Sequence, residues 1–142
     1  MSSEPQNIHV EAVLDELVRQ FAEPVACFRE LVQNALDAGT PQIDIDFEWR
    51  EPDGDESPGT MVVDVRDYGE GMDRSLIENR LTKLFSSGKT GDYTKIGRFG
   101  IGFVSVFALE PFCVCVDTGR SGEYWRVLFD GRQSFELISL DH

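Results

Sequence analysis

Three polar side chains at helical spacing are the first candidates for chemistry in this 142-residue sequence. Between Phe28 and Gly39, Asn34 and Asp37 fall about 40° and 20° to either side of Glu30 on a helical wheel. A glutamate can accept a proton from an attacking water, and an amide oxygen is a hard ligand suited to Mg²⁺. A solvated polar face would use the same residues, so the spacing alone leaves both interpretations open.

A second candidate is a carboxylate at the end of an expected strand. Asp67 continues the apolar face of residues 61–67, where an unpaired buried carboxylate would be costly. Gly69 and Gly71 follow in a turn that lets another group approach the backbone. Asp67 therefore either accepts from an exocyclic amine such as that of adenine, or hydrogen-bonds to its own turn.

A third candidate is a set of glycines before an expected apolar helix. Gly97, Gly100 and Gly102 can hold backbone N–H groups toward an anion at the start of that helix. The alternative is that they only permit a tight turn. The spacing therefore indicates a candidate phosphate-binding segment without requiring one.

The charge distribution favours a small anionic ligand. The formal net charge of −13 argues against nucleic acid or an anionic membrane as the main partner, since both need a basic footprint. Residues 79–102 nevertheless carry five basic side chains and one acidic one. This local basic segment lies just where the glycine set is found.

Two familiar phosphate-binding motifs are excluded by their spacing. The stretch 88–90, Gly-Lys-Thr, lacks the P-loop glycine five residues earlier, where Lys83 stands. Both Gly-x-Gly pairs fail the dinucleotide fingerprint, because Arg74 and Ser105 replace its third glycine.

Hydrophobic periodicity predicts the elements that position these candidates. Helices are expected over 10–21, 28–39, 74–84 and 103–110, and strands over 43–50, 61–67, 112–117, 123–130 and 134–140. Gly39 is expected to end the central helix, and hairpin turns are expected at 117–119 and 130–132. The order favours an α+β fold with helices on one face of a mostly antiparallel sheet, in one domain.

Cysteine usage and hydropathy predict a cytoplasmic protein. Cys27 stands alone, while Cys113 and Cys115 alternate along an expected strand and are poorly placed to pair. Reduced thiols are the simplest interpretation. The polar N-terminal residues contain no apolar targeting core, and no apolar run approaches about 18 residues, so we expect no association with a membrane.

In this order, the three motifs resemble those of the GHKL ATPases, the superfamily of gyrase B, Hsp90, the histidine kinases and MutL. The stretches ELVQNALDA (30–38) and IGRFGIGF (96–103) are most similar to Hsp90-like and MORC-like ATPase domains. The resemblance covers about residues 10 to 140. It implies the Bergerat fold, a two-layer α/β sandwich with a mixed sheet, and a single ATP-binding domain over 1–142.

The resemblance also implies a site for ATP and Mg²⁺. Glu30 resembles the general base, Asn34 the Mg²⁺ ligand and Asp67 the acceptor for the adenine amino group, while 82–96 resembles a lid over the nucleotide. The residues implied to bind ATP are Asn34, Asp37, Asp67, Gly69, Gly71, Met72, Ser86, Ser87, Lys89, Gly97, Arg98, Phe99, Gly100, Ile101, Gly102 and Phe103.

The function implied is Mg-dependent ATP binding with slow hydrolysis. Family ATPases often complete the site with a Lys or Arg from a second domain, and a missing cation slows phosphoryl transfer. We therefore expect a protein partner or a second domain, with an ATP-dependent dimer as one form. Hsp90-like members also place a Thr beside the adenine-site Asp, whereas the matching stretch here, 134–137, has none.

Two alternative functions remain open on the sequence. One is an ATP-gated protein-interaction module without significant turnover, in which the nucleotide orders the lid. The other is a histidine-kinase-type catalytic domain that transfers phosphate to a partner's histidine, since the chain carries only His9 and His142.

Overall fold

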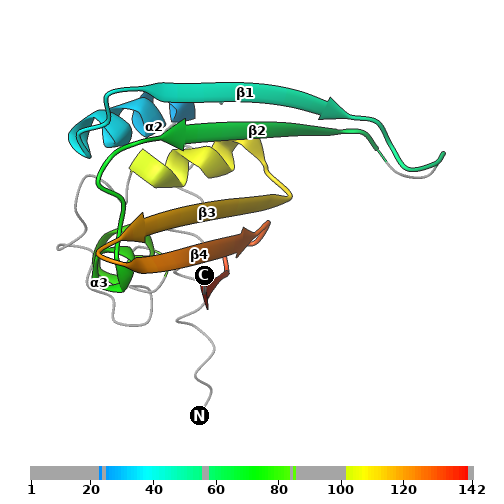
Figure 1. Ribbon diagram of the computed structural model, residues 1–142. Helices are drawn as coiled ribbons and strands as arrows, with labels where there is room; N and C mark the ends of the chain where they lie inside the picture. Colours follow the sequence, from blue (N-terminus) through cyan, green and yellow to red (C-terminus); the bar gives the residue numbers. More distant parts are fainter. Residues whose placement is uncertain (1–22, 24, 56–57, 84, 86–101, 141–142) are drawn as a thin grey trace, which may run out of the picture.

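A computed structural model describes residues 23, 25–55, 58–83, 85 and 102–140 of the chain (Figure 1). Its elements are the helix α2 (Ala26–Asp37), the strands β1 (Ile43–Arg50) and β2 (Thr60–Asp67), the short helix α3 (Arg74–Leu76), the π-helix η1 (Ile77–Leu81), the 3₁₀ helix η2 (Ser105–Leu109), and the strands β3 (Cys113–Arg120), β4 (Glu123–Asp130) and β5 (Phe135–Ser139). The α+β class is confirmed, and the helix expected over 10–21 lies outside the described residues. Among those residues, no helix combines the length and apolar character needed to cross a membrane.

The described strands form two antiparallel sheets. β1 pairs with β2 so that Ile43 faces Asp67 at one end and Arg50 faces Thr60 at the other. The second sheet has the order β3-β4-β5. Asp67 therefore ends its strand as predicted, at the end where the chain enters β1 from α2.

The helix α2 lies against the first sheet, as Figure 1 shows. The Phe28 ring packs edge-on against Phe47 of β1, with centroids 5.7 Å apart. Gly39 ends the helix as predicted, because its φ of +77° is in the left-handed region that favours glycine. Thr40 N–H then donates to the Ala35 carbonyl at 3.2 Å, which closes the last turn.

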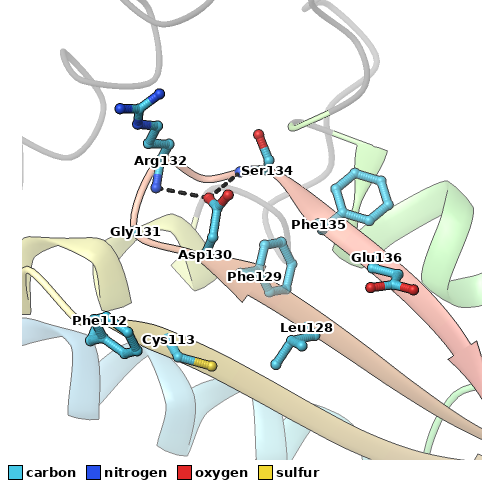
Figure 2. A pocket seen from close by; sticks show the side chains of 10 residues that line it. All are labelled: Phe112, Cys113, Leu128, Phe129, Asp130, Gly131, Arg132, Ser134, Phe135 and Glu136. Atoms are coloured by element: carbon cyan, nitrogen blue, oxygen red, sulfur yellow. Dashed lines mark hydrogen bonds between the residues drawn. The ribbon is translucent and has the colours of Figure 1, made fainter.

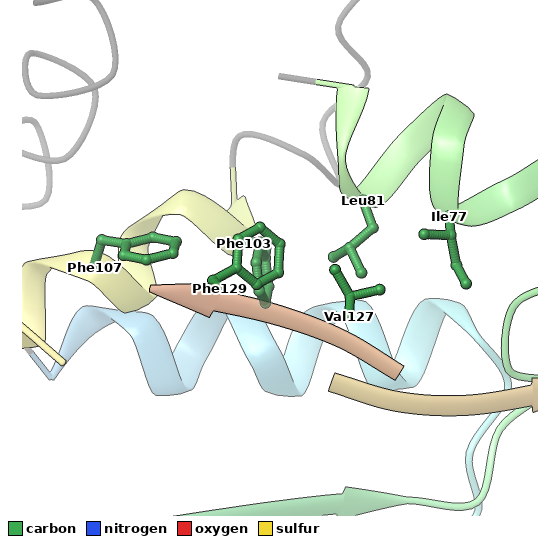
Figure 3. Close-up of a cluster of buried hydrophobic side chains, with 6 residues drawn as sticks. All are labelled: Ile77, Leu81, Phe103, Phe107, Val127 and Phe129. Carbon is green, nitrogen blue, oxygen red and sulfur yellow. The ribbon is translucent and has the colours of Figure 1, made fainter. Parts of the chain in front are cut away.

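A cluster of aromatic rings forms the core between the second sheet and the helical segments. The Phe129 ring of β4 contacts Phe103 and Phe107, with centroids 5.4 and 5.8 Å apart. This packing fixes the segment that begins at Gly102 over β4. Figure 3 shows the buried members of the cluster, which are Ile77, Leu81, Phe103, Phe107, Val127 and Phe129.

The hairpin turn expected at 117–119 was wrong. β3 continues to Arg120, and the reversal occurs at Ser121 and Gly122, whose φ values are +55° and +80°. Two successive positive φ values match the right-handed twist of the flanking strands, so this turn is the favoured one. The Asp-Thr-Gly stretch resembles a turn in composition, but its Thr118 pairs with Trp125 inside the ladder.

Asp117 also belongs to that ladder, where it faces Arg126. The guanidinium donates to both carboxylate oxygens, at 2.7 and 2.8 Å. Arg126 is the main reason that the pKa of Asp117 is lowered below its usual value. An opposite-charge pair across neighbouring strands supports the extended strand rather than a turn.

The helix expected over 74–84 divides into two short segments. Asp73 caps it by accepting from Leu76 N–H at 2.9 Å, and a π-helix then runs over Ile77–Leu81. Thr82 N–H donates to the Ile77 carbonyl at 2.9 Å, five residues back, which makes this turn wider than an α-helical one. The helix expected over 103–110 is α-helical at residues 102–104 and continues as the 3₁₀ helix η2 over Ser105–Leu109.

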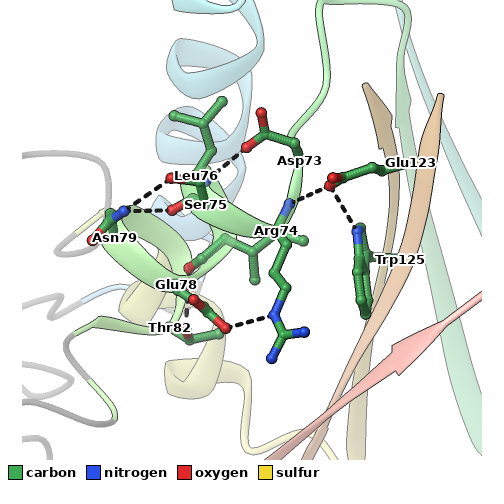
Figure 4. Close-up of polar contacts among 10 residues, drawn as sticks. Asp73, Arg74, Ser75, Leu76, Glu78, Asn79, Thr82, Glu123 and Trp125 are labelled. Atoms are coloured by element: carbon green, nitrogen blue, oxygen red, sulfur yellow. Dashed lines mark hydrogen bonds and ion pairs between the residues drawn. The ribbon is translucent and has the colours of Figure 1, made fainter. Parts of the chain in front are cut away.

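Polar contacts hold this short helical region to β4 (Figure 4). Arg74 N–H donates to Glu123 Oε2 at 2.9 Å, and the Trp125 indole N–H donates to the same oxygen at 3.1 Å. The Arg74 guanidinium also lies 5.4 Å from the Trp125 ring, within cation–π range. The segment that follows the Asp67 turn is therefore attached to the second sheet.

Candidate functional site

The polar face of α2 is divided between half-buried and exposed residues. Glu30 and Asn34 are half-buried, one turn apart on the helix, whereas Asp37 is exposed. Asp37 Oδ1 accepts from the Gln33 side-chain amide at 2.9 Å on the outer surface of the helix. The three residues share a face as predicted, and Glu30 and Asn34 are the two of them that the fold partly covers.

The carboxylate of Glu30 lies directly against Gly102. A Cβ atom built on Gly102 would stand 2.7 Å from Glu30 Oε2, closer than real Cβ contacts allow. Glycine at this position therefore leaves the space that the carboxylate fills. Since Gly102 is the last of the three predicted glycines, the fold brings that segment's end to the acid of α2.

The turn after Asp67 is fastened to the end of α2. Glu70 N–H donates to the Ala38 carbonyl at 3.1 Å, and Tyr68 N–H donates to Thr40 Oγ1 at 2.9 Å. A Cβ atom on Gly69 would stand 2.8 Å from the Ala38 carbonyl oxygen, so glycine is required for this close approach. The second candidate motif is therefore positioned by the same helix that carries Glu30 and Asn34.

The Asp67 carboxylate uses one oxygen to shape its own turn. Its Oδ1 accepts from Gly69 N–H at 2.9 Å, whereas Oδ2 accepts no hydrogen bond from any residue that the structure describes. The side chain is exposed. One oxygen thus serves the turn, and the second is an acceptor that a ligand donor can use. This geometry is compatible with both interpretations from the sequence, the adenine acceptor and the hydrogen bond to its own turn.

The neighbouring Tyr68 side chain turns to the outer surface of β1. Its hydroxyl donates to Asp44 Oδ2 at 2.7 Å. Hydrogen bonds from Gln42 and Tyr68 lower the pKa of Asp44, and the bond to Asp44 raises the pKa of Tyr68. This contact anchors the first residue of the turn and leaves Asp67 as the acid beside the glycines.

The far side of the turn contacts β3, which the sequence did not predict. Met72 N–H donates to Thr118 Oγ1 at 2.8 Å. Gly71 has φ +71°, and a Cβ atom there would collide with the Gly119 carbonyl oxygen. The two β3 residues that make this contact are Thr118 and Gly119. Their composition is typical of a turn, which is why the sequence predicted a hairpin turn there instead.

Some predicted residues fall elsewhere or outside the described part. Phe103 is 5% exposed and its ring belongs to the core, so its side chain anchors the residues after Gly102 to the core. Met72 is half-buried and packs against the same core. The remaining predicted residues lie outside the described ranges, namely Ser86, Ser87, Lys89, Gly97, Arg98, Phe99, Gly100 and Ile101, with most of the 82–96 lid.

A separate hollow lies at the other end of the second sheet (Figure 2). It encloses about 660 Å³ and its lining includes Phe112, Leu128 and Asp130, none of which is a predicted site residue. Asp130 Oδ1 accepts from Arg132 N–H and Ser134 N–H, at 2.8 and 3.0 Å. Its carboxylate therefore serves the β4–β5 turn.

Comparison with known proteins adds an independent finding. A family model described as "Histidine kinase-, DNA gyrase B-, and HSP90-like ATPase" matches residues 23–125, which is more than half of the chain. This range contains α2, the Asp67 turn and the end of the glycine segment.

The relatives found by sequence include DNA mismatch repair proteins. MutL of Chromohalobacter salexigens is 29% identical over 116 residues, covering 78% of this chain and 17% of that protein. MutL of Cellvibrio japonicus is 26% identical over 121 residues, covering 82% of this chain and 18% of that protein. The chain thus spans less than a fifth of the length of these relatives.

Proposed function

Because the chain belongs to the histidine kinase-, DNA gyrase B- and HSP90-like ATPase family, we propose that it binds Mg-ATP and hydrolyses it slowly in an Hsp90-like manner. The observation that carries the proposal is the contact of the Glu30 carboxylate with Gly102. An acid held against the end of a glycine segment, on a helix that also fastens the Asp67 turn, supports a single nucleotide site.

Asp67 is proposed to recognise the base. Its Oδ2 is an acceptor in the turn that carries Gly69 and Gly71, and it accepts no hydrogen bond from any residue that the structure describes. The 6-amino group of adenine is a donor, whereas guanine presents a carbonyl oxygen there. A carboxylate therefore favours adenine, since a site built for one hydrogen-bonding pattern rejects the opposite one. Met72 would flank the base from the core side.

Glu30 and Asn34 are proposed to act at the phosphates. Glu30 would orient a water and accept its proton as the water attacks the terminal phosphate. Asn34, one helical turn away, would hold the Mg²⁺ ion through its amide oxygen. An ion held there would supply positive charge near the phosphate oxygens. Both side chains are half-buried one turn apart on α2, which supports placing both at the same phosphates.

Slow turnover is proposed because none of the ion pairs within the described part of the chain involves the Glu30 carboxylate. The described ion pairs engage Arg50, Arg74, Arg120 and Arg126 with other carboxylates. A Lys or Arg from a second domain or from a partner protein would raise the rate. An ATP-dependent dimer and a cytoplasmic location belong to the same proposal. The MutL relatives act in mismatch repair, and a role there is a proposal for the whole protein.

Isothermal titration with ATP, ADP and GTP, with and without Mg²⁺, tests the proposal. We expect one site per chain, ATP binding that Mg²⁺ strengthens by about tenfold (~1.4 kcal/mol), and much weaker binding of GTP. The metal dependence tests Asn34, and the base preference tests Asp67. No heat with ATP, or equal binding of ATP and GTP, would contradict the proposal.

A further inference from the structure

The end of β3 supplies a side-chain acceptor to the turn that carries Asp67. Thr118 is half-buried on β3, and its Oγ1 accepts the Met72 N–H at 2.8 Å. A strand residue normally makes its ladder contacts through the backbone, and Thr118 does so with Trp125. Its hydroxyl is therefore an additional contact, made to a segment 46 residues away in the sequence.

This contact joins the turn that follows β2 to the end of β3. Within the described residues, β2 and β3 belong to separate sheets, so no ladder between them fixes their spacing. The turn of residues 67–72 contacts β3 through the Thr118 hydroxyl and through Gly71, which packs on the Gly119 carbonyl. The nearby ion pair between Glu70 and Arg120 is 3.6 Å long with one partner 73% exposed, and such pairs contribute little.

The position of the turn also decides where the Asp67 carboxylate points. Asp67 Oδ1 is tied to Gly69 N–H, so the carboxylate and the turn move together. On one side, Ala38 and Thr40 hold the turn to α2. On the other side, the Thr118 hydroxyl accepts a hydrogen bond from the backbone of the turn, at the Met72 N–H.

We propose that Thr118 is a positioning residue for base recognition: its hydroxyl fixes the Met72 N–H and thereby sets the distance between the Asp67 carboxylate and the second sheet. Thr118 acts through the backbone of the turn and does not contact the nucleotide. The proposal rests on the proposed function, because it assigns Thr118 a part in the same adenine site.

Thr118→Val tests the hydroxyl alone, since valine keeps the shape of threonine but cannot accept a hydrogen bond. We expect the dissociation constant for ADP to rise by about tenfold, as for loss of one hydrogen bond that leaves a half-buried donor without a partner. The preference for ADP over GDP should fall with it. By hydrogen exchange, the Met72 amide should exchange about tenfold faster.

Two variants serve as controls, made in the same 142-residue chain. Thr118→Ser restores a hydroxyl and should bind ADP within about twofold of the wild type. Thr60→Val makes the same substitution at the exposed start of β2 and should leave both readouts unchanged. A general loss of stability would alter amides throughout the sheets, whereas loss of positioning affects the turn.

The outcomes separate this proposal from the proposed function. Wild-type affinity in Thr118→Val, or equally weak binding in Thr118→Ser, would overturn the role of Thr118. If Thr118→Val does not fold, exchange in the wild type decides: a protected Met72 amide that ADP protects further supports the role, and an unprotected one overturns it. Absence of ADP binding to the wild type itself would show that the proposed function is wrong, and the role of Thr118 would fall with it.

Discussion

Glu30→Gln is expected to lower the rate of ATP hydrolysis by at least about 100-fold while changing ATP affinity by less than about threefold. A positioned general base contributes roughly 10²- to 10⁴-fold, and glutamine cannot accept the proton. Glutamine has the same shape, so the close contact with Gly102 is kept. Release of labelled phosphate measures the rate, and isothermal titration measures the affinity.

A matched control is available just after β1. Glu51 is exposed, and Glu51→Gln removes the same charge outside the segments assigned to the site, so its hydrolysis rate should equal that of the wild type. Equal rates in Glu30→Gln and the wild type would exclude Glu30 as the base. A wild type that binds ATP without releasing phosphate would favour the ATP-gated module, and a partner labelled by the γ-phosphate would favour the kinase.

Asp67→Asn is expected to weaken ADP binding by about 100-fold. The amide oxygen can still accept the Gly69 N–H, so the turn keeps its shape. The amide NH₂ group, however, replaces the acceptor at Oδ2 with a donor that faces the adenine amino group. Loss of a hydrogen bond to a charged group costs roughly 1.5–3 kcal/mol, which corresponds to about 10- to 150-fold.

The control for this variant lies on the same strand. Asp64 is exposed and faces Asp46 across the β1–β2 pair, so Asp64→Asn removes one of two like charges. Its ADP affinity should be that of the wild type. Affinity for ADP that is retained in Asp67→Asn would show that another group recognises the base.

Features set by local periodicity were predictable from the sequence. The alternation of apolar residues predicted β1 and β4 at their observed bounds, and the 3.6-residue period predicted the polar face of α2. Gly39 marked the helix end because only a residue that tolerates a positive φ fits there. These signals arise from neighbouring residues and need no knowledge of the rest of the fold.

Contacts between distant segments were not predictable in the same way. The approach of Glu30 to Gly102 and the hydrogen bond of Met72 to Thr118 depend on how the two sheets are placed. The π-turn over Ile77–Leu81 has the same apolar spacing as an α-helix over so short a stretch. Asp-Thr-Gly has the composition of a turn, and only cross-strand pairing assigns it to β3.

One nucleotide is proposed to contact the α2 face, the Asp67 turn and the segment that starts at Gly102. Titration of ¹⁵N-labelled protein with Mg-ADP, followed by mapping of the amides whose chemical shifts change, tests this. We expect a continuous set of changes that includes Asn34, Gly69 and Gly102 and leaves the hollow around Asp130 unaffected. Changes confined to that hollow, or absent from Asn34 and Gly69, would contradict this proposal.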